Sequence, residues 1–338
     1  MVTVHDVARA AGVSISTVSR ALASPERVAG ETRDRVTRIA AELGYRPNRA
    51  ASGLRMGRTH AVGLLVPDLE NPYFATVTKA VQARARAEGY EVFVADSDED
   101  ADVEAELIGA LAARTDGLLV ASPRSGDAEL RAALEGVTAV LVSRELSGDT
   151  AARSGTPQVP SVAVDDADGV AQVLGHLSAL GHRLVGVAAG PPSSWSGARR
   201  VAGLAEAAEH REVELVQLGT FPPYFAGGVQ AADHALANGV TAVVAFNDLM
   251  ALGILDRLRH RGVDIPGEMS VVGFDDVQLA TLVSPALTTV HAPLARLGRR
   301  AVDLLLARLR GGAPASTRLP VELTIRGSTG PVPARPAD

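Results

Sequence analysis

Residues 4–22 have the sequence VHDVARAAGVSISTVSRAL, two short helical patterns separated by Gly12. Apolar residues form one stripe before this glycine and another after it, namely Val7, Ala8 and Ala11, then Val13, Val18 and Leu22. Thr3 and Asp6 have the spacing of a capping box, and Ser14 can cap the second helix. Two helices joined by a tight glycine turn are typical of a helix-turn-helix, whose second helix enters the major groove of DNA.

A third helical pattern follows in ETRDRVTRIAAELG, residues 31–44. Val36, Ile39, Ala40 and Leu43 share one face of it, so this helix is expected to close a three-helix core. Pro47 disfavours helical backbone at the residue before it, so the helix should end at about Tyr45.

Charge is distributed unevenly along the chain. Residues 1–60 hold ten arginines and five acidic residues, whereas the remainder holds 23 basic and 34 acidic residues. The net charge of −6 therefore combines a basic head of about +5 with an acidic body of about −11. This division is typical of a DNA-binding module attached to a domain with another task.

Composition excludes several classes of protein. The chain has no cysteine, which rules out disulfides, thiol nucleophiles and cysteine metal sites. We find no signal-peptide pattern and no apolar run of membrane-spanning length, so we expect a cytoplasmic, nucleoid-associated protein with no membrane partner.

From residue 61 onward, apolar strand patterns alternate with amphipathic helical patterns. Continuous apolar strands separated by helices indicate parallel sheets with both faces covered. About ten strands are too many for one ordinary sheet, so we expect two doubly wound halves that divide near residue 160. The last helical pattern (residues 295–312) and the strand pattern LPVELTIRG (residues 319–327) should return across this division.

The predicted fold class is thus α/β, with a small N-terminal three-helix helix-turn-helix domain and a core of doubly wound parallel sheets. We place the DNA-binding domain at residues 1–46, a linker at 47–58, the core at 59–330 and a disordered tail at 331–338. The N-terminal half of the core would comprise about 59–160 plus 292–320, and the C-terminal half about 161–291 plus 321–330.

Polar and aromatic residues gather where the predicted strands end, the edge at which open parallel sheets bind ligands. Asp165, Asn247 and Asp275 follow strands, although helix capping is a simpler explanation for any one of them. Eight of the eleven aromatic residues lie in or beside such segments: Tyr73, Phe74, Trp195, Phe221, Tyr224, Phe225, Phe246 and Phe274. Burial at strand ends would account equally well for Phe246 and Phe274. Rings together with carboxylates and an amide indicate a cleft for a sugar, or for a nucleobase held between Tyr73 and Phe74.

An enzyme is the less favoured class. The chain contains no GxxxxGK[ST] loop, no GxGxxG fingerprint and no GxSxG elbow, and its eight histidines lack metal-ligand spacing. Asp165 and Asp275 could form an acid/base pair, but they serve equally well as acceptors for ligand hydroxyls. We therefore expect no catalytic residue, no metal and no cofactor.

Several segments, in order, resemble the LacI/GalR (lac repressor-type) family of bacterial transcription regulators. They include TVHDVARAAGVSISTVSRAL, GLRMGRTHAVGLLVPDLENPYF, GARRVAG, AFNDLMALG, VVGFDD and SPALTTVHAP. The resemblance covers residues 2 to about 330. It implies a periplasmic-binding-protein-like core of two subdomains, a homodimer, a palindromic double-stranded DNA operator and a small-molecule effector.

The resemblance also implies roles for residues of the DNA-binding domain. Ile15, Ser16 and Arg20 match the base-reading positions, and arginine to guanine is the strongest such contact. Phosphate contacts would come from Thr3, Ser14, Thr17 and Ser19.

Residues 48–55 match the family's hinge helix, in which Asn48, Leu54 and Arg55 contact the minor groove and Leu54 is the wedge between base pairs. Ser52-Gly53 departs from the family pattern, and Gly53 should weaken this helix by about 1 kcal/mol relative to alanine.

For the effector, the resemblance implicates Arg200, Asn247 and Asp275, and more loosely Tyr73, Phe74, Asp165, Ser196 and Phe221. Trp195 lies where ligand contacts vary. We expect a repressor of a carbohydrate-utilisation operon that a sugar inducer releases from DNA. The alternatives are a corepressor-dependent regulator sensing a nucleobase or nucleoside, and a solute-binding protein, which would share the core but lack the basic head.

Overall fold

The computed structural model describes residues 2–23, 25–45, 58–146 and 159–332. The chain divides into two compact units, Met1–His60 and Ala61–Asp338, which are considered separately below. Within the described residues, no helix is long and apolar enough to cross a membrane.

The first unit is a small helical domain. Its elements are α1 (Val4–Ala11), α2 (Ile15–Ala23), a 3-10 turn (Pro25–Arg27) and α3 (Gly30–Glu42). Gly12 ends α1 with a φ of 66°, a left-handed conformation that favours glycine. The Thr17 N–H donates to Ser14 Oγ at 3.1 Å, and the Thr3 N–H donates to the Asp6 carboxylate at 2.9 Å. Both caps expected from the sequence are thereby confirmed.

The predicted apolar faces of this unit meet in one core. It contains the buried side chains of Val7, Ala8, Ala11, Val18, Ala21, Val36 and Ala40. The prediction for Leu43 was wrong, since its side chain is 39% exposed. Leu43 is the C-cap residue of α3, directly after Glu42, and its side chain lies outside the packed core of this unit.

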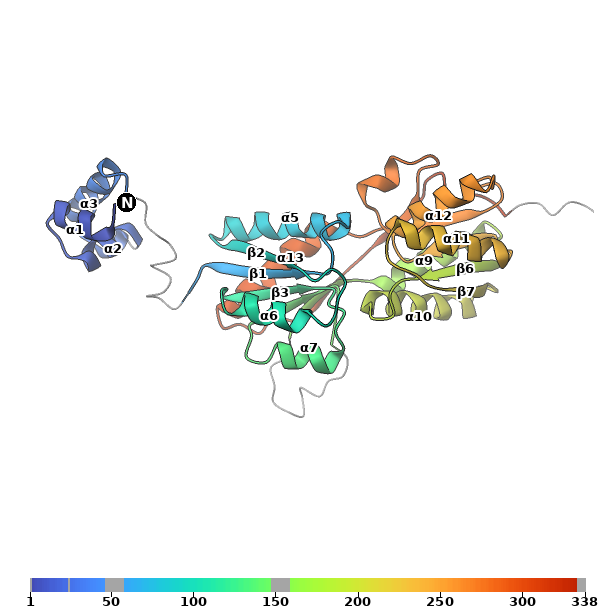
Figure 1. Ribbon diagram of the computed structural model, residues 1–338, viewed down its shortest axis with the longest axis horizontal. Helices are drawn as coiled ribbons and strands as arrows, with labels where there is room; N and C mark the ends of the chain where they lie inside the picture. Colours follow the sequence, from blue (N-terminus) through green and yellow to red (C-terminus); the bar gives the residue numbers. More distant parts are fainter. Residues whose placement is uncertain (1, 24, 46–57, 147–158, 333–338) are drawn as a thin grey trace, which may run out of the picture. The chain divides into compact units, whose positions relative to one another are not determined.

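The second unit contains two sheets, each six-stranded within the described residues (Figure 1). The first has the order β11-β5-β4-β3-β1-β2, and all its neighbouring strands are parallel. Its strands are β1 (Ala61–Val66), β2 (Glu91–Asp96), β3 (Gly117–Ala121), β4 (Ala139–Val142), β5 (Ser161–Val164) and β11 (Thr317–Leu319).

The second sheet has the order β12-β10-β9-β8-β6-β7, in which only the pairing of β10 with β12 is antiparallel. Its strands are β6 (Leu184–Ala189), β7 (Glu214–Thr220), β8 (Ala242–Ala245), β9 (Ser270–Asp275), β10 (Thr288–His291) and β12 (Glu322–Thr324). The central strands are buried along their length, as the continuous apolar patterns predict.

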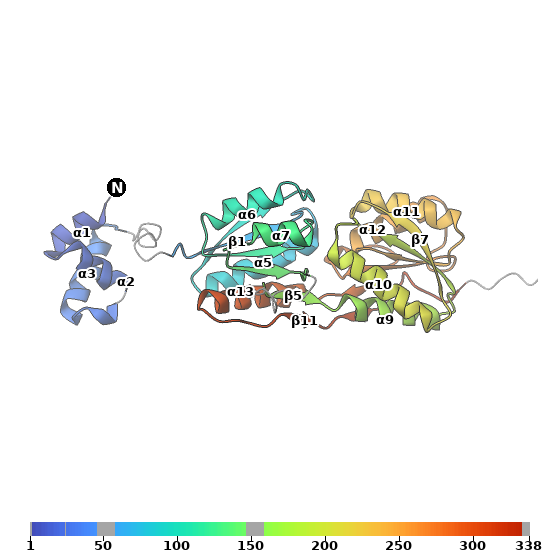
Figure 2. The same cartoon turned by 90° about the horizontal axis from the view of Figure 1, so that it is seen from below.

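Helices cover both faces of each sheet (Figures 1 and 2). On the first sheet, α5 (Pro72–Ala87) packs beside α13 (Leu294–Leu309), and α6 (Glu104–Ala112) packs beside α7 (Asp127–Ala133) on the other face. On the second, the pairs are α9 (Asp166–Ala179) with α10 (Trp195–Glu209) and α11 (Phe225–Ala237) with α12 (Asp248–His260). A 3-10 turn (Gln278–Thr281) follows β9.

Glycines let α11 and α12 touch through their backbones. A Cβ atom at Gly228 would lie 1.9 Å from the Met250 carbonyl oxygen, and one at Gly253 would lie 2.0 Å from that of Phe225. No larger residue fits at either position without separating the helices.

The described chain crosses between the halves three times: after β5, after β10 and after β11. The predicted division near residue 160 falls slightly too early, because Ser161 pairs with Leu141 of β4 and keeps β5 in the first sheet. The single strand expected at residues 319–327 is instead two strands in different sheets, β11 and β12, on either side of Pro320. Strand β10 is short and was not predicted.

Candidate DNA-binding helix and effector pocket

Helix α2 presents part of its predicted base-reading set to solvent. Ser16 and Arg20 are exposed, and no hydrogen bond or ion pair found among the described residues of this unit engages the Arg20 guanidinium. Ile15 differs, because it is partly buried against the helical core. Its apolar side chain is therefore only partly available to a base.

The predicted phosphate contacts lie mainly at the N-termini of α1 and α2. Ser14 Oγ lies 2.8 Å from Ser16 Oγ and 2.9 Å from Thr17 Oγ1. The Thr3 hydroxyl donates to Asp6 at 2.7 Å, and the hydrogen bonds from Thr3 lower the pKa of Asp6. Exposed hydroxyls and N–H groups at a helix N-terminus suit an anion such as a DNA phosphate. Ser19 lies further along α2 and is half-buried.

The hinge residues Asn48, Leu54 and Arg55, and the Ser52-Gly53 departure, lie outside the described residues.

A pocket opens between the two halves of the second unit, at the carboxyl ends of the parallel strands, with about 400 Å³ of space that includes open solvent. Residues of both halves line it: Asn71, Tyr73, Phe74, Glu99, Ser122 and Arg124 from the first, and Ser194, Ser196, Arg200, Pro223, Phe246, Asn247 and Asp275 from the second. This is the edge at which open parallel sheets bind ligands.

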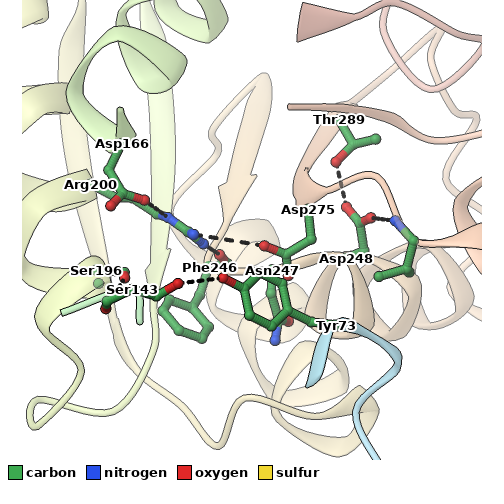
Figure 3. Close-up of polar contacts among 12 residues, drawn as sticks. Tyr73, Ser143, Asp166, Ser196, Arg200, Phe246, Asn247, Asp248, Asp275 and Thr289 are labelled. Carbon is green, nitrogen blue, oxygen red and sulfur yellow. Dashed lines mark hydrogen bonds and ion pairs between the residues drawn. The ribbon is translucent and has the colours of Figure 1, made fainter. Parts of the chain in front are cut away.

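Arg200 is the centre of the second half's wall (Figure 3). Its Nε donates to the Asp166 carboxylate at 2.8 Å, its Nη1 donates to the Phe246 carbonyl at 2.6 Å, and its Nη2 lies 3.7 Å from the Asp275 carboxylate. The guanidinium carbon also lies 3.5 Å from the centroid of the Phe274 ring. A buried guanidinium needs such partners, since unpaired it would be strongly destabilising.

The charged groups around Arg200 shift one another's pKa values. Burial acts to lower the pKa of Arg200, but the charges of Asp166 and Asp275 outweigh it and raise that pKa. Burial raises the pKa of Asp166, and that of Asp275 more strongly, against the opposing charge of Arg200. Asp275 is therefore a desolvated carboxyl group, whose nearest cationic partner is beyond hydrogen-bond distance.

Two hydroxyl contacts meet at Ser143, one within the first half and one from the second half. The Tyr73 hydroxyl lies 2.6 Å from Ser143 Oγ, and Ser196 Oγ donates to the Ser143 carbonyl across the pocket at 3.3 Å (Figure 3). Burial raises the pKa of Tyr73, so this hydroxyl stays protonated and can donate. One hydrogen bond between the halves thus joins the Ser196 side chain to the main chain at Ser143.

Tyr73 and Phe74 are in edge-to-face contact, with ring centroids 4.9 Å apart and ring planes at 76°. Both side chains are buried. The arrangement expected for a nucleobase between these two rings is wrong, because perpendicular rings in contact leave no slot for a third ring.

Asn247 and Asp248 begin α12. Asn247 Oδ1 accepts from the Met250 N–H at 2.9 Å, and its amide donates to the Pro223 carbonyl at 2.9 Å. The buried Asp248 carboxylate accepts from the Val277 N–H at 2.8 Å and the Thr289 hydroxyl at 2.5 Å (Figure 3). Burial raises the pKa of Asp248 to about 7.

Comparisons with known proteins agree with this architecture. The profile for bacterial regulatory proteins of the lacI family matches residues 3–48, and that for a periplasmic binding protein-like domain matches residues 174–329. The HTH-type transcriptional regulator DegA of Bacillus subtilis is 31% identical over 338 residues, 98% of each chain. MalR of Streptomyces coelicolor, also an HTH-type transcriptional regulator, is 35% identical and covers 97% of this chain and 96% of its own. This chain belongs to the lacI family.

A solved structure of the lac repressor dimer bound to operator and the anti-inducer ONPF shares the fold. It has a TM-score of 0.86 and 30% identity, covering 97% of this chain and 99% of its own. The lacI-family protein described here is thus a DNA-binding transcriptional regulator with a ligand-binding domain, and not an enzyme.

The structure brings six of the nine predicted effector residues to the pocket: Tyr73, Phe74, Ser196, Arg200, Asn247 and Asp275. Asp165 is not among them. Its side chain caps α9, accepting from the Asp168 N–H at 3.2 Å, and the next residue, Asp166, reaches Arg200 instead.

Trp195 and Phe221 are likewise absent from the pocket lining. Trp195 is half-buried beside Arg199, whose guanidinium carbon lies 5.7 Å from the centroid of the indole ring. Phe221 is buried in the core of the second half, edge-on to His234. Phe274 is buried, as the simpler explanation proposed, whereas Phe246 also lines the pocket.

Sequence reasoning missed further residues of this site: Asn71, Glu99, Ser122, Arg124, Ser143, Asp166, Ser194 and Pro223. Ser143 and Asp166 follow predicted strands, so the sequence marks them as polar residues at strand ends without assigning them to the effector. Glu99 and Arg124 each lie three residues beyond the end of a strand, where position along the chain no longer predicts the direction of a side chain.

Proposed function

We propose that this regulator is a repressor of a carbohydrate-utilisation operon. It binds a palindromic operator as a dimer on the cytoplasmic nucleoid and leaves it when a sugar inducer binds. Residues 1–46 read the DNA, residues 47–58 form the hinge, and residues 59–330 bind the effector and the second subunit. The operator-bound lac repressor dimer, similar along almost the whole chain, supports the DNA-bound dimer.

The observation that carries the sugar assignment is the acceptor-rich pocket around Asp275. The desolvated Asp275 carboxyl group, Ser122 and Ser196 line a space that Tyr73, Phe74 and Phe246 border with apolar surface, and the Ser196 hydroxyl donates to the Ser143 carbonyl. Sugars offer many hydroxyl donors and an apolar ring face, which fits such a lining. The similar transcriptional regulator CelR was solved as a complex with cellobiose, with a TM-score of 0.71 and 31% identity.

On DNA, Arg20 reads a guanine, and Ser16 with the exposed part of Ile15 supports it. Loss of the arginine contact should cost about 1–3 kcal/mol of discrimination. Thr3, Ser14, Thr17 and Ser19 hold phosphates. Asn48, Leu54 and Arg55 enter the minor groove, and the hinge is an order–disorder switch because a helix of about eight residues is marginal in water.

The experiment measures operator binding by fluorescence anisotropy. The operators are palindromes selected from a random pool. A panel of neutral sugars and nucleosides is then added. We expect at least one sugar to release the DNA, and an Asp275→Asn variant to bind the same operator while losing that response. Tighter operator binding with a nucleoside would replace this proposal with the corepressor alternative. Operator release in an Asp275→Asn variant identical to that of the wild type would refute the pocket assignment.

A further inference from the structure

The first half's wall of the pocket carries an ion pair between Glu99 and Arg124, which the family resemblance did not implicate. The pair is bidentate, since Arg124 Nε and Nη2 donate to the two carboxylate oxygens at 2.6 and 2.7 Å. The Arg124 side chain is 5% exposed and that of Glu99 is 15% exposed. Two parallel hydrogen bonds give such a pair both strength and fixed geometry.

Further hydrogen bonds fix the positions of both Glu99 and Arg124. The Glu99 N–H donates to the Pro67 carbonyl at 2.7 Å, which fixes the loop after β2. The Arg124 N–H donates at 2.7 Å to the carboxylate of Glu104, a buried residue that also accepts from the Ser125 N–H at 2.9 Å. Arg124 Nη1 donates to the Ser122 carbonyl at 3.0 Å. Glu99 is therefore kept on Arg124 by a rigid frame.

The pair leaves the described pocket lining without an available cation. Arg124 and Arg200 are its only basic residues, and each is engaged by carboxylates. In the second half, burial and the negative charges of Glu99, Asp68 and Asp98 raise the pKa of Tyr224, the neighbour of the pocket residue Pro223, to about 12. A phosphate or carboxylate in this space would therefore meet carboxylates and no free guanidinium.

We propose that Glu99 is a specificity-determining residue, which masks Arg124 and restricts the pocket to uncharged effectors. Phosphorylated sugars, sugar acids and nucleotides are excluded. This inference rests on the proposed function, in which the pocket binds the effector, and it names the charge class of that effector.

The test unmasks Arg124 and measures anion binding with inorganic phosphate, so it does not depend on identifying the effector. Full-length Glu99→Gln and Glu99→Ala variants are titrated with phosphate, with chloride at matched ionic strength, and thermal unfolding is followed. We expect at least one variant to bind phosphate roughly tenfold or more tightly than the wild type does. The gain should disappear when Arg124→Met is added.

The matched control is Glu145→Gln. Glu145 forms the same bidentate pair with Arg318, at 2.7 and 2.6 Å, but neither residue lines the pocket. The proposal is overturned if neither Glu99 variant gains phosphate binding, if Glu145→Gln gains it equally, or if the wild type already binds phosphate as tightly. Failure of the proposed function would appear separately, as the absence of operator release by any neutral sugar.

Discussion

Replacing Asp166 by asparagine should strongly destabilise the second unit. The substitution keeps the size of the side chain but removes one of the two carboxylates beside the buried Arg200. What remains is Asp275, 3.7 Å from Nη2 and too far for a hydrogen bond.

The expected magnitude follows from these contacts. Removing one partner of a buried ion pair costs about 3–5 kcal/mol, because the other charge stays buried without compensation. Asp275 and the Phe274 ring still attract the guanidinium, so we expect the lower end, about 3 kcal/mol. The neighbouring Asp165→Asn is the matched control. Asn and Asp are equally good helix caps, so this change at the α9 cap should alter stability by under about 0.5 kcal/mol.

The assay is urea unfolding at equal protein concentration, followed by tryptophan fluorescence. Trp195 is the only tryptophan and lies at the start of α10, so its signal reports the unit that contains Arg200. Equal slopes with a shifted midpoint would show a change in stability alone. An Asp166→Asn protein within about 1 kcal/mol of the wild type, or an equal loss in Asp165→Asn, would refute the reasoning.

Three further predictions concern other parts of the chain. The Arg20→Ala variant should lose about 1–3 kcal/mol of discrimination at one symmetric pair of operator bases. The measurement is its affinity for a panel of operators that each carry one base change. Equal weakening on every operator would instead mean that Arg20 contacts a phosphate. Burial raises the pKa of Asp248 from 3.8 to about 7, so the folded state binds this proton more tightly than the unfolded chain does. The contribution of this group to stability should therefore fall by about 1 kcal/mol per pH unit between about pH 4 and 7. Asp248→Asn should flatten that slope in urea unfolding, and a curve parallel to that of the wild type would contradict the cause. Gly228→Ala should lower the free energy of unfolding by more than about 2 kcal/mol. The control is Gly109→Ala, whose Cβ meets nothing within 4 Å and which should raise that free energy by up to about 1 kcal/mol. Similar unfolding midpoints for the two variants would disprove the α11–α12 contact.

Sequence patterning predicted the elements better than the directions of their side chains. Apolar runs and alternating helices were enough for two parallel sheets with covered faces, because a strand buried on both sides has few alternatives to continuous Val, Leu and Ala. Strand β10 was not predicted, because its four residues include two threonines and form no continuous apolar run. Residues 317–324 form two strands because the segments before and after Pro320 pair with different sheets. That pairing depends on strands distant in sequence.

The site shows the same division. Asp165 and Asp166 are both aspartates at the end of β5, and the sequence does not rank them. The start of α9 distinguishes them. Asp165, the residue before α9, becomes the cap of that helix, and the Asp166 carboxylate contacts Arg200. Phe221 followed a strand like the pocket aromatics, but its ring packs into the core beside His234. Whether a ring borders a pocket or fills a core depends on packing between elements that are distant in sequence.

The three crossings between the halves also determine the order in which the protein can assemble during synthesis. The first half lacks α13 and β11 until residue 319 has been made, although its other strands precede residue 165. Until then the part of the first sheet's apolar face that α13 covers, next to β3 and β4, lacks that helix, and α5 is the helix already present there. The DNA-binding unit can fold as soon as it leaves the ribosome, whereas the half that follows it must wait for almost the whole chain. A message truncated before α13 would therefore yield a helix-turn-helix attached to an aggregation-prone sheet, and not a shorter regulator.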